Sequence, residues 1–387
     1  MKKKIKVLQV IPKLGYGGAE TGCYDLAHFL YEQNCKSYII TSGGELLKYV
    51  KKGKVKIIKL PVHSKNPILI LLNAFLISFI ILFNNITIVH VRSRAPAWSC
   101  LIATKITRRK LITTFHGTYN FSNKIKKFYN SIMVRSDLVI AGSNFIFSHI
   151  NENYGDFFVD NKRKLLVIFR GINTKFFHSQ KTSPLKLEKF AKEHQVDRNK
   201  FIILMPGRLT YWKGQKIFIE AIKKVSESEN IQSFQAIILG SEQGRSVYKK
   251  QLLGLVQQHR LNKVVKFIDH CEEMPVAYGI ANMACSCSSE PEAFGRVSVE
   301  AQSMQIPIIA SNIDGLKEIV DTKPPCALFV DPCDKTDIAK KIEKLILSHK
   351  LRNELGSKAY YNSKNFDKSI MLSSYLKFYN NLVNTFN

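Results

Sequence analysis

The sequence predicts an α/β protein of two domains, each a doubly wound parallel sheet covered by helices. Two observations support this prediction. The chain has 387 residues, 45% of them apolar, and a chain of this length ordinarily buries two hydrophobic cores rather than one. Short apolar runs, bounded by glycine or polar residues, recur along the chain between stretches of helical length. That alternation is typical of parallel strands joined by helices.

The expected strands fall into two groups. The first group comprises residues 7–10, 38–41, 86–91, 111–114, 138–141 and 165–168. The pattern stops in a polar, lysine-rich stretch between His178 and Lys200, and the second group comprises residues 201–205, 235–239, 264–268, 284–287, 306–310 and 327–330. We therefore expect an N-terminal domain over residues 1–180, a linker over 181–200 and a C-terminal domain over 201–360.

Positive charge is concentrated in the first half of the chain. Residues 1–180 carry 28 Lys and Arg against 8 Asp and Glu, a net charge of +20, whereas the other 207 residues carry 30 against 22. This excess suggests an anionic partner, either nucleic acid or the acidic face of a cytoplasmic membrane. General lysine enrichment of the sequence is an equally good explanation. No nucleic-acid-binding module is recognisable, so nucleic acid is not expected as a partner.

The cysteines and the start of the chain favour a cytoplasmic protein. None of the 8 cysteines forms a Cys-x-x-Cys pair, and we interpret them as buried thiols in a reducing compartment. The apolar stretch after the basic start covers only residues 7–11, which is too short for an export signal. We interpret it as the first strand.

Residues 68–83 are almost wholly apolar, interrupted only by Asn73 and Ser78. The segment falls just short of the ~17 residues that span a bilayer. A buried helix is the interpretation we favour, while an interfacial helix and a membrane span remain open.

A second segment of interest spaces Phe121, Ile125, Phe128 and Ile132 as one helix face, with lysines at 124, 126 and 127 between them. It is either an ordinary amphipathic helix or a basic helix that lies on an anionic membrane.

Candidate binding residues follow the expected strands, because ligands of open α/β sheets bind beyond the carboxyl ends of the strands. After the first strand, Gly17 and Gly18 let the backbone approach a ligand and expose amides at a helix N-terminus. Glu20 stands where a dinucleotide fingerprint has its third glycine, which argues against a nicotinamide enzyme. His116 follows the strand 111–114, although a lone histidine is more often structural.

The second half offers two cations after the strand 201–205. Arg208 follows Gly207, and Lys213 lies five residues further on. A guanidinium and an ammonium group together suit a diphosphate, although such pairs are as often solvated surface charges. No Asp-x-Asp or His-x-x-x-His pattern occurs in the sequence, so these cations would have to replace a metal ion.

Two carboxylates follow the strand 284–287. Glu292 is expected in a loop and Glu300 eight residues on in a helix, a separation of about 12 Å that is too large for the acid and base of a glycosidase. We expect each carboxylate to bind a different hydroxyl of one long ligand. The amides at Gly295 and the helix dipole would face an anion between them.

In their order along the chain, these residues resemble the motifs of the retaining glycosyltransferases of family 4, which have the two-domain GT-B fold. The matching elements are Gly17-Gly18-Ala19-Glu20, His116-Gly117, Asn144, Arg170-Gly171-Ile172-Asn173, Gly207-Arg208, Lys213-Gly214, Gly240, Met274-Pro275 and Glu292 with Glu300.

The resemblance implies two Rossmann-like domains facing a cleft, with residues 361–387 forming a last helix that crosses back to the first domain. The catalytic residues it implies are His116, Arg208, Lys213 and Glu292. The donor- and nucleotide-binding residues it implies are Gly17, Gly18, Gly207, Gly240, Met274, Phe294, Gly295 and Glu300.

The resemblance also implies a mechanism, in which a sugar moves from a nucleotide-diphosphate sugar to an acceptor hydroxyl with retention of configuration. The departing β-phosphate would take the acceptor's proton, with no metal or other cofactor. Together with the charge, this suggests a lipid-linked or glycan acceptor in lipopolysaccharide, glycolipid or other cell-envelope glycan synthesis, at the inner face of the cytoplasmic membrane. A hydrolysing nucleotide-sugar epimerase of the same fold is the alternative.

The sequence departs from the family pattern at two places. Gln305 stands where the family usually has glycine before the next strand. The sequence therefore does not fix where the helix that contains Glu300 ends. Near Gly315, Asp314 replaces the first member of the usual double glycine, and an extra carboxylate there would weaken the binding of a diphosphate donor.

Overall fold

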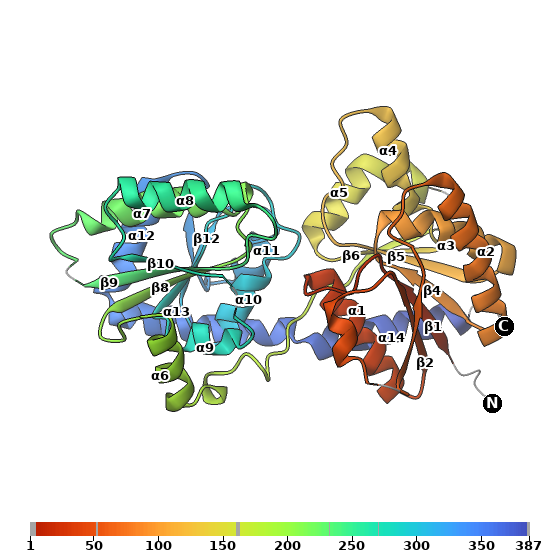
Figure 1. Ribbon diagram of the computed structural model, residues 1–387, viewed down its shortest axis with the longest axis horizontal. Coiled ribbons are helices and arrows are strands. Elements are labelled where there is room, and N and C mark those ends of the chain that lie inside the picture. Colours follow the sequence, from red (N-terminus) through yellow and green to blue (C-terminus); the bar gives the residue numbers. More distant parts are fainter. Residues whose placement is uncertain (1–4, 52, 160–162, 232, 270, 385–387) are drawn as a thin grey trace. The chain divides into compact units, whose positions relative to one another are not determined.

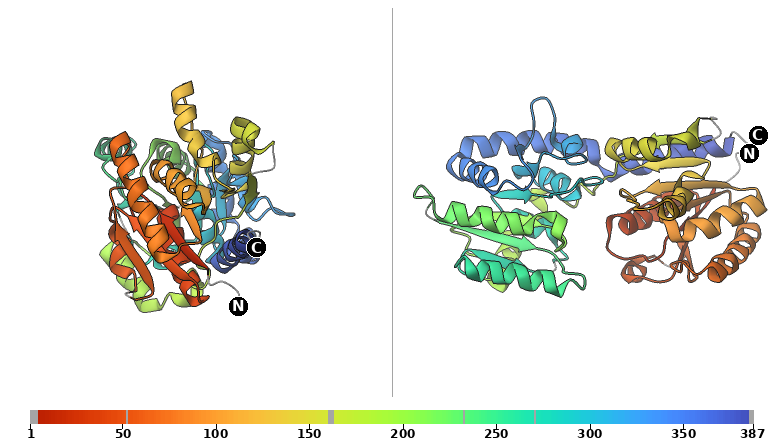
Figure 2. Two further views of the ribbon diagram at one scale, coloured as in Figure 1. Left: turned by 90° about the vertical axis from the view of Figure 1, so that its right-hand side faces the viewer. Right: turned by 90° about the horizontal axis from the view of Figure 1, so that it is seen from above.

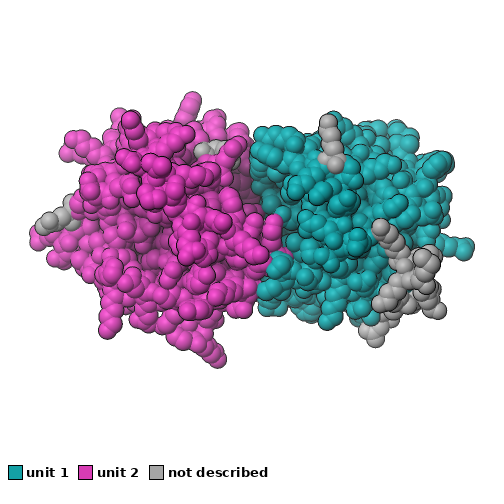
Figure 3. All heavy atoms as spheres, turned by 90° about the horizontal axis from the view of Figure 1, so that it is seen from below, with its two compact units in different colours: residues 1–170, 369–387 teal, residues 171–368 magenta. Residues whose placement is uncertain are grey.

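A computed structural model describes residues 5–51, 53–159, 163–231, 233–269 and 271–384. The chain divides into two compact units, coloured separately in Figure 3. Unit 1 comprises residues 1–170 and 369–387, and unit 2 comprises residues 171–368. Each unit is built around one parallel sheet, which confirms the predicted fold class of two Rossmann-like domains.

The sheet of unit 1 has seven parallel strands in the order β3-β2-β1-β4-β5-β6-β7 (Figure 1). Its strands are β1 (Lys6–Val10), β2 (Lys36–Thr41), β3 (Val55–Lys59), β4 (Ile88–Val91), β5 (Lys110–Phe115), β6 (Leu138–Ala141) and β7 (Lys164–Val167). The chain moves outward from β1 to β3 and then returns to β4 on the other side of β1. Right-handed crossovers therefore place α1 (Gly18–Glu32) on one face of the sheet and α2 (Pro67–Asn84), α3 (Arg94–Thr107) and α5 (Asn144–Tyr154) on the other.

The last helix, α14 (Lys368–Asn384), belongs to unit 1 from Ser369 onward, which confirms the predicted crossing back. It begins later than the predicted residue 361, because residues 361–363 still belong to α13 of unit 2. Leu372, Tyr375 and Tyr379 of α14 share one core cluster with α1 and the sheet. The Tyr379 hydroxyl lies 2.6 Å from Nδ1 of the buried His90. Figures 1 and 2 show this helix, at the blue end of the colour scale, alongside unit 1. Residues 385–387 of the predicted helix lie outside the described residues.

The sheet of unit 2 has six parallel strands in the order β10-β9-β8-β11-β12-β13. They are β8 (Phe201–Pro206), β9 (Phe234–Leu239), β10 (Val265–Ile268), β11 (Met283–Ser286), β12 (Ile308–Ser311) and β13 (Leu328–Val330). The helices that alternate with these strands or follow them are α7 (Gln215–Ser226), α8 (Ser246–Gln258), α9 (Met274–Gly279), α10 (Arg296–Ser303), α11 (Lys317–Val320), α12 (Lys335–Leu347) and α13 (His349–Ser363). Buried side chains of α7, α8 and α12 form one core with the strands.

Every predicted strand overlaps an observed one, but one strand was missed. β3 (Val55–Lys59) reads Val-Lys-Ile-Ile-Lys, and its lysines interrupt the continuous apolar run by which the others were recognised. It lies at the edge of the sheet, and β2 is its one partner among the strands that the structure describes. An edge strand is half solvated, so polar residues are tolerated there.

The unit boundary lies at residues 170–171, before the predicted boundary at residue 180. The predicted linker, residues 181–200, contains helix α6 (Pro184–Glu193), which packs against α9 of unit 2. Its lysines face solvent while Phe190 and Ala191 are buried. The polar composition that suggested a linker is thus that of an amphipathic surface helix.

The favoured interpretation of residues 68–83, a buried helix, holds for one face only. They form α2, which Asn66 caps through its side chain and Asn85 ends in a left-handed conformation. One face of α2 packs on α3, but only 28% of the helix is buried. By length and composition it is apolar enough to cross a membrane.

The second apolar segment is also less regular than expected. Helix α4 covers only Lys124–Asn130, so the four apolar residues do not share one helix face. Ile132 is fully buried in the core, whereas Ile125 and Phe128 are 81% and 58% exposed.

The predicted buried thiols are found with two exceptions. The structure buries the six cysteines Cys23, Cys35, Cys100, Cys285, Cys287 and Cys326, while Cys271 is half-buried and Cys333 exposed. Burial raises the pKa of the Cys23 thiol to about 11, so this group stays protonated at neutral pH.

Candidate active site

In both units the predicted site residues follow the carboxyl ends of the strands. In unit 2, Gly207 follows β8, Gly240 follows β9, Met274 lies beyond β10 and Glu292 beyond β11. Because all six strands are parallel, these strand ends lie at one edge of the sheet. This is the edge at which open α/β sheets bind ligands.

Two glycines bring the ends of β8 and β9 together. A Cβ atom on Gly240 would stand 1.9 Å from the carbonyl oxygen of Gly207, and Gly207 itself has φ +148°. Only glycine allows that approach and that conformation. The turn they form carries Arg208, whose side chain is exposed and makes no ion pair with any residue that the structure describes.

Lys213 and Glu292 form an ion pair at the same edge. The Lys213 ammonium nitrogen lies 2.7 Å from Glu292 Oε1, and the side chains are only 14% and 8% exposed. The Ser288 hydroxyl donates a further hydrogen bond to the same carboxylate. Lys213 also lies over the ring of Trp212, so both charges are held in place by several contacts.

Two further glycines fix the loops that carry this pair. A Cβ on Gly214 would stand 1.8 Å from the Cys287 carbonyl oxygen, and one on Gly315 would stand 1.6 Å from the Glu292 carbonyl oxygen. Both residues have positive φ, +79° and +81°. Gly315 therefore lets its loop lie directly against the backbone of Glu292, where the Glu292 amide donates to the Asp314 carbonyl oxygen.

Glu300 is held separately from Glu292. Its carboxylate accepts hydrogen bonds from Tyr278, at 3.0 Å, and from Arg296, at 2.7 Å. Burial and the adjacent Glu300 charge raise the pKa of the Tyr278 hydroxyl well above its usual range, which keeps it a donor. The two carboxylates therefore have different partners, Lys213 and Ser288 for Glu292 and Tyr278 and Arg296 for Glu300.

Phe294 and Gly295 shape the start of α10. Gly295 has φ +66° and a Cβ on it would stand 2.4 Å from Leu316, so glycine is required. The Phe294 ring is buried and packs against Phe366. Any contact of Phe294 with a donor would therefore fall to its backbone rather than its ring.

In unit 1, the loop after β1 leads into α1 through Gly17 and Gly18. A Cβ on Gly17 would collide with the Glu20 carboxylate, and one on Gly18 would stand 3.1 Å from Arg170. The exposed backbone at this helix N-terminus thus lies between a carboxylate and a guanidinium. The absence of a Cβ at both glycines lets these two side chains lie close to the backbone.

His116 follows β5 and is contacted by Arg170, which donates from Nη2 to His116 Nδ1. Burial, followed by the charges of Arg170 and Arg92, lowers the pKa of His116 well below its usual range. The ring is therefore neutral with its proton on Nε2. Nε2 has no hydrogen-bond partner among the described residues, so His116 is set up to donate a hydrogen bond rather than to accept a proton.

A buried arginine adds positive charge beneath this site. Arg92 is 3% exposed and donates from Nε to Gln9 at 2.9 Å. Its Nη2 has no partner among the described residues. The carboxyl edge of unit 1 is therefore electropositive around His116.

Sequence reasoning missed several partners of the predicted residues. Arg296 was detectable, because it lies four residues before Glu300 on one helix. Ser288 lies four residues before Glu292 as well, but in a loop, where that spacing predicts no contact. Tyr278 and Arg92 gave no comparable signal, since their contacts join distant parts of the chain. Among the described residues, no group of three or more His, Cys, Asp or Glu side chains is arranged to hold a metal ion.

Two family models match the chain, one on each half. The model described as Glycosyltransferase Family 4 matches residues 16–176, and the model described as Glycosyl transferases group 1 matches residues 187–361.

Relatives match over most of their length. A solved glycosyltransferase from Rickettsia africae ESF-5 is 36% identical, with a TM-score of 0.89 and coverage of 98% of this chain and 99% of that one. Anabaena Alr3699/HepE in complex with UDP-glucose is 21% identical, with a TM-score of 0.81 and coverage of 97% and 99%, a likeness of fold.

Two curated relatives also match most of the chain. The capsular polysaccharide biosynthesis glycosyltransferase CapM of Staphylococcus aureus is 27% identical over 338 residues, 85% of each chain. The N,N'-diacetylbacillosaminyl-diphospho-undecaprenol alpha-1,3-N-acetylgalactosaminyltransferase of Campylobacter jejuni is 22% identical over 334 residues, 83% of this chain and 84% of its own.

Proposed function

The chain belongs to the glycosyltransferases of family 4 and has the GT-B fold, and from this premise we propose that it transfers a sugar from a nucleotide-diphosphate sugar to an acceptor hydroxyl with retention of configuration. The observation that carries the proposal is the grouping of Arg208, Lys213 and Glu292 at the carboxyl edge of unit 2. Two cations and a carboxylate at one strand edge suit a ligand that combines a diphosphate with sugar hydroxyls.

The donor is proposed to bind unit 2. Arg208 and Lys213 would contact the diphosphate, Glu292 and the backbone at Phe294 and Gly295 the sugar, and Glu300 the ribose. Gly207, Gly240 and Met274 would line the same edge. Relative Alr3699/HepE was solved with UDP-glucose, which makes UDP-sugars the first donors to test.

Catalysis is proposed to rest on stabilising the leaving group. The bond from the anomeric carbon to the phosphate oxygen breaks, the bond to the acceptor oxygen forms on the same face, and the acceptor's proton passes to the β-phosphate. Arg208 and Lys213 would stabilise the charge that grows on this phosphate, without a metal ion or other cofactor. A single such donor is typically worth ~3 kcal/mol, or about 10² in rate.

Unit 1 is proposed to serve the acceptor and the transferred sugar. Gly17 and Gly18 offer backbone amides at the N-terminus of α1, and His116 offers its Nε2 proton to a sugar oxygen. A neutral histidine fits this role, since the proposed mechanism uses no protein base.

The acceptor is proposed to be a lipid-linked or glycan precursor of the cell envelope. One relative is named as acting on a diphospho-undecaprenol compound and another as a capsular polysaccharide glycosyltransferase. Together with the net charge of +20 over residues 1–180, this supports a cytoplasmic protein that works at the anionic inner face of the cytoplasmic membrane. The alternative, a hydrolysing nucleotide-sugar epimerase, gains no support from the comparisons.

The proposal is tested with purified protein and a panel of UDP-, GDP- and ADP-sugars. We expect one nucleotide sugar to raise the melting temperature, since a ligand that binds only the folded state stabilises it. With an acceptor, NMR of the product should show the anomeric configuration of the donor, at the same rate with and without EDTA. An inverted product would overturn retention, and rapid consumption of donor without acceptor would favour the epimerase.

A further inference from the structure

Helix α2 presents a stripe of exposed apolar side chains. The stripe consists of Ile68, Leu71, Leu72, Phe75, Leu76, Phe79, Leu82 and Phe83, of which Ile68, Phe79 and Phe83 are 75%, 65% and 90% exposed. These positions recur at intervals of three and four residues, so they share one side of the helix. We call this surface the α2 stripe. Helix α2 contains no charged residue.

The polarity of α2 is the reverse of that of a soluble surface helix, which turns its polar side to water. Asn73 and Ser78 lie on the buried side of α2 instead, and the third polar residue, Asn84, is half-buried at its C-terminal end. Asn73 donates to the Pro61 carbonyl oxygen at 3.2 Å, and Ser78 donates to the Ala74 carbonyl oxygen at 2.8 Å. The outer side carries only apolar groups. A contiguous apolar surface of this kind marks a contact with another apolar body.

The fold rules out a crossing of the bilayer by α2. The helix joins β3 to β4, and both strands belong to the one sheet of unit 1. Its inner side packs along α3, where the Ser99 hydroxyl donates to the Ile70 carbonyl oxygen at 2.9 Å. A span would have to break these contacts and separate neighbouring parts of one sheet. Any apolar body must therefore meet α2 from the side, along a length of about 27 Å.

Cations surround the C-terminal end of the stripe. Lys6 donates to the carbonyl oxygen of Asn84 at 2.9 Å, and Lys56 to its side-chain oxygen at 3.4 Å. Helix α3 runs parallel to α2, since each connects a strand end to the start of the next strand. It therefore ends at the same edge, where Lys105 and Arg108 are exposed on either side of the exposed Ile106.

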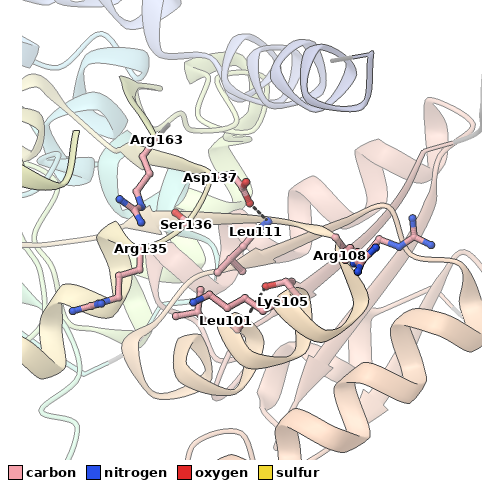
Figure 4. A pocket seen from close by; sticks show the side chains of 10 residues that line it. Leu101, Lys105, Arg108, Leu111, Arg135, Ser136, Asp137 and Arg163 are labelled. Carbon is pink, nitrogen blue, oxygen red and sulfur yellow. Dashed lines mark hydrogen bonds between the residues drawn. The ribbon is translucent and has the colours of Figure 1, made fainter. Parts of the chain in front are cut away.

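The same edge holds a basic pocket of about 270 Å³, shown in Figure 4. Besides Lys105 and Arg108, its cationic lining residues are Arg109, Arg135 and Arg163. Among the described residues that line it, the one carboxylate is Asp137, which is already engaged by the Lys110 ammonium and the Leu111 amide, both at 2.9 Å. The pocket thus offers an excess of positive charge beside an apolar surface.

We propose that the α2 stripe binds an anionic lipid bilayer, with α2 lying in the plane of the interface and the cations at its C-terminal end contacting lipid phosphates. An interfacial helix buries its apolar side at the boundary between headgroups and acyl chains, and neighbouring cations add affinity for anionic lipid. A second copy of the chain would instead bring two halves of net charge +20 together. The inference deepens the proposed membrane location and rests on it.

The test is co-sedimentation of the full chain with vesicles of phosphatidylcholine alone or mixed with phosphatidylglycerol, at low salt. We expect binding to the mixed vesicles only. Phe75→Ser with Phe79→Ser should weaken binding by more than tenfold, and Lys105→Gln with Arg108→Gln by about tenfold. All four side chains are exposed, so the melting temperature should stay within about 2 °C of wild type.

Helix α4 provides the matched control. Ile125 and Phe128 are also exposed, with lysines beside them, so Ile125→Ser with Phe128→Ser removes similar apolar area elsewhere on unit 1. We expect this variant to bind vesicles within about twofold of wild type. Equal losses in the α2 and α4 variants, or none in the α2 variant, would overturn the assignment.

Three measurements distinguish vesicle binding from self-association, from a membrane span and from a loss of donor binding. Sedimentation velocity without vesicles should show a monomer, and a dimer that the α2 variant dissociates would overturn the proposal in favour of self-association. Alkaline carbonate should release the protein from vesicles, since resistance to it indicates a span. Donor binding by thermal shift should be unchanged in the α2 variant. A wild-type protein that binds donor but no vesicles refutes this inference and leaves the sugar transfer standing.

Discussion

The Lys213 ammonium lies 2.7 Å from the Glu292 carboxylate, and the two residues follow strands β8 and β11, which are neighbours in the sheet of unit 2. The pair balances its own charge when no donor is present. A phosphate that reaches Lys213 must therefore compete with Glu292. Arg208 makes no ion pair with the described residues, and so supplies the unbalanced positive charge at this edge.

Replacing Arg208 should affect rate and leave stability unchanged. The side chain is exposed, so Arg208→Ala should leave the melting temperature within about 2 °C of wild type. If its charge stabilises the leaving phosphate, turnover should fall at least ~10-fold, and up to about 10². Steady-state kinetics with the identified donor and a thermal melt check both statements. Normal turnover would remove Arg208 from the mechanism.

Replacing Lys213 should lower both the turnover rate and the stability of the protein. Lys213→Ala strands the largely buried Glu292 carboxylate, which should cost ~3 kcal/mol of unfolding free energy as well as at least tenfold in turnover. Lys213→Ala with Glu292→Gln removes both charges, and should regain most of the stability but none of the activity. Urea unfolding and kinetics of the single and double variants separate the two effects. A single variant as stable as wild type would contradict the observed ion pair.

Gly315 is predicted to be essential to the site although it touches no ligand. A methyl group on it would stand 1.6 Å from the Glu292 carbonyl oxygen, so Gly315→Ala must displace the loop that carries Glu292. We expect a weaker thermal shift with donor and a loss of several degrees in melting temperature. Gly254 in α8 has open space around it, and Gly254→Ala should stabilise the protein by ~1 kcal/mol. Unchanged donor binding in Gly315→Ala would contradict the steric argument.

The strands and the strand-end site residues were predictable because their signals are local. Apolar runs indicate buried strands. The residue types that follow them indicate which ligands the carboxyl edge of the sheet can bind. Contacts between strand ends were not predictable in the same way. The spacing of Lys213 and Glu292 along the chain does not show that they pair, because the pairing depends on β8 and β11 lying side by side.

The misjudged segments share another cause. Composition alone does not distinguish a buried apolar helix from one that another body covers, so the exposed side of α2 appears only in the structure. The lysine-rich sequence of α6 predicts a linker because the apolar strand pattern stops there. In both cases tertiary packing, rather than local preference, decides which side chains reach solvent.

Gln305 is predicted to be a site of stored strain. It follows the C-terminus of α10 with φ +62°, a left-handed conformation in which glycine is favoured over other residues. Gln305→Gly should therefore raise the unfolding free energy by ~1 kcal/mol. The control is Lys340→Gly, at an exposed interior position of α12, which should lower it by ~1 kcal/mol. Chemical denaturation of both variants gives the test, and a destabilised Gln305→Gly would contradict the strain argument.

Stability is predicted to fall as the pH drops below about 6.5, the ordinary pKa of histidine. Burial, with Arg92 nearby, lowers the pKa of His90 well below that value, and burial with Arg170 lowers that of His116. Between the lowered and the ordinary pKa, the unfolded chain takes up protons that the folded chain excludes, so acid favours unfolding. Each histidine contributes up to about 1.4 kcal/mol per pH unit in that window. Urea unfolding between pH 7.5 and 5 should show this slope of unfolding free energy against pH. In His116→Gln the slope should be smaller by the contribution of one histidine. An unchanged slope in this variant would mean that His116 is protonated in the folded protein.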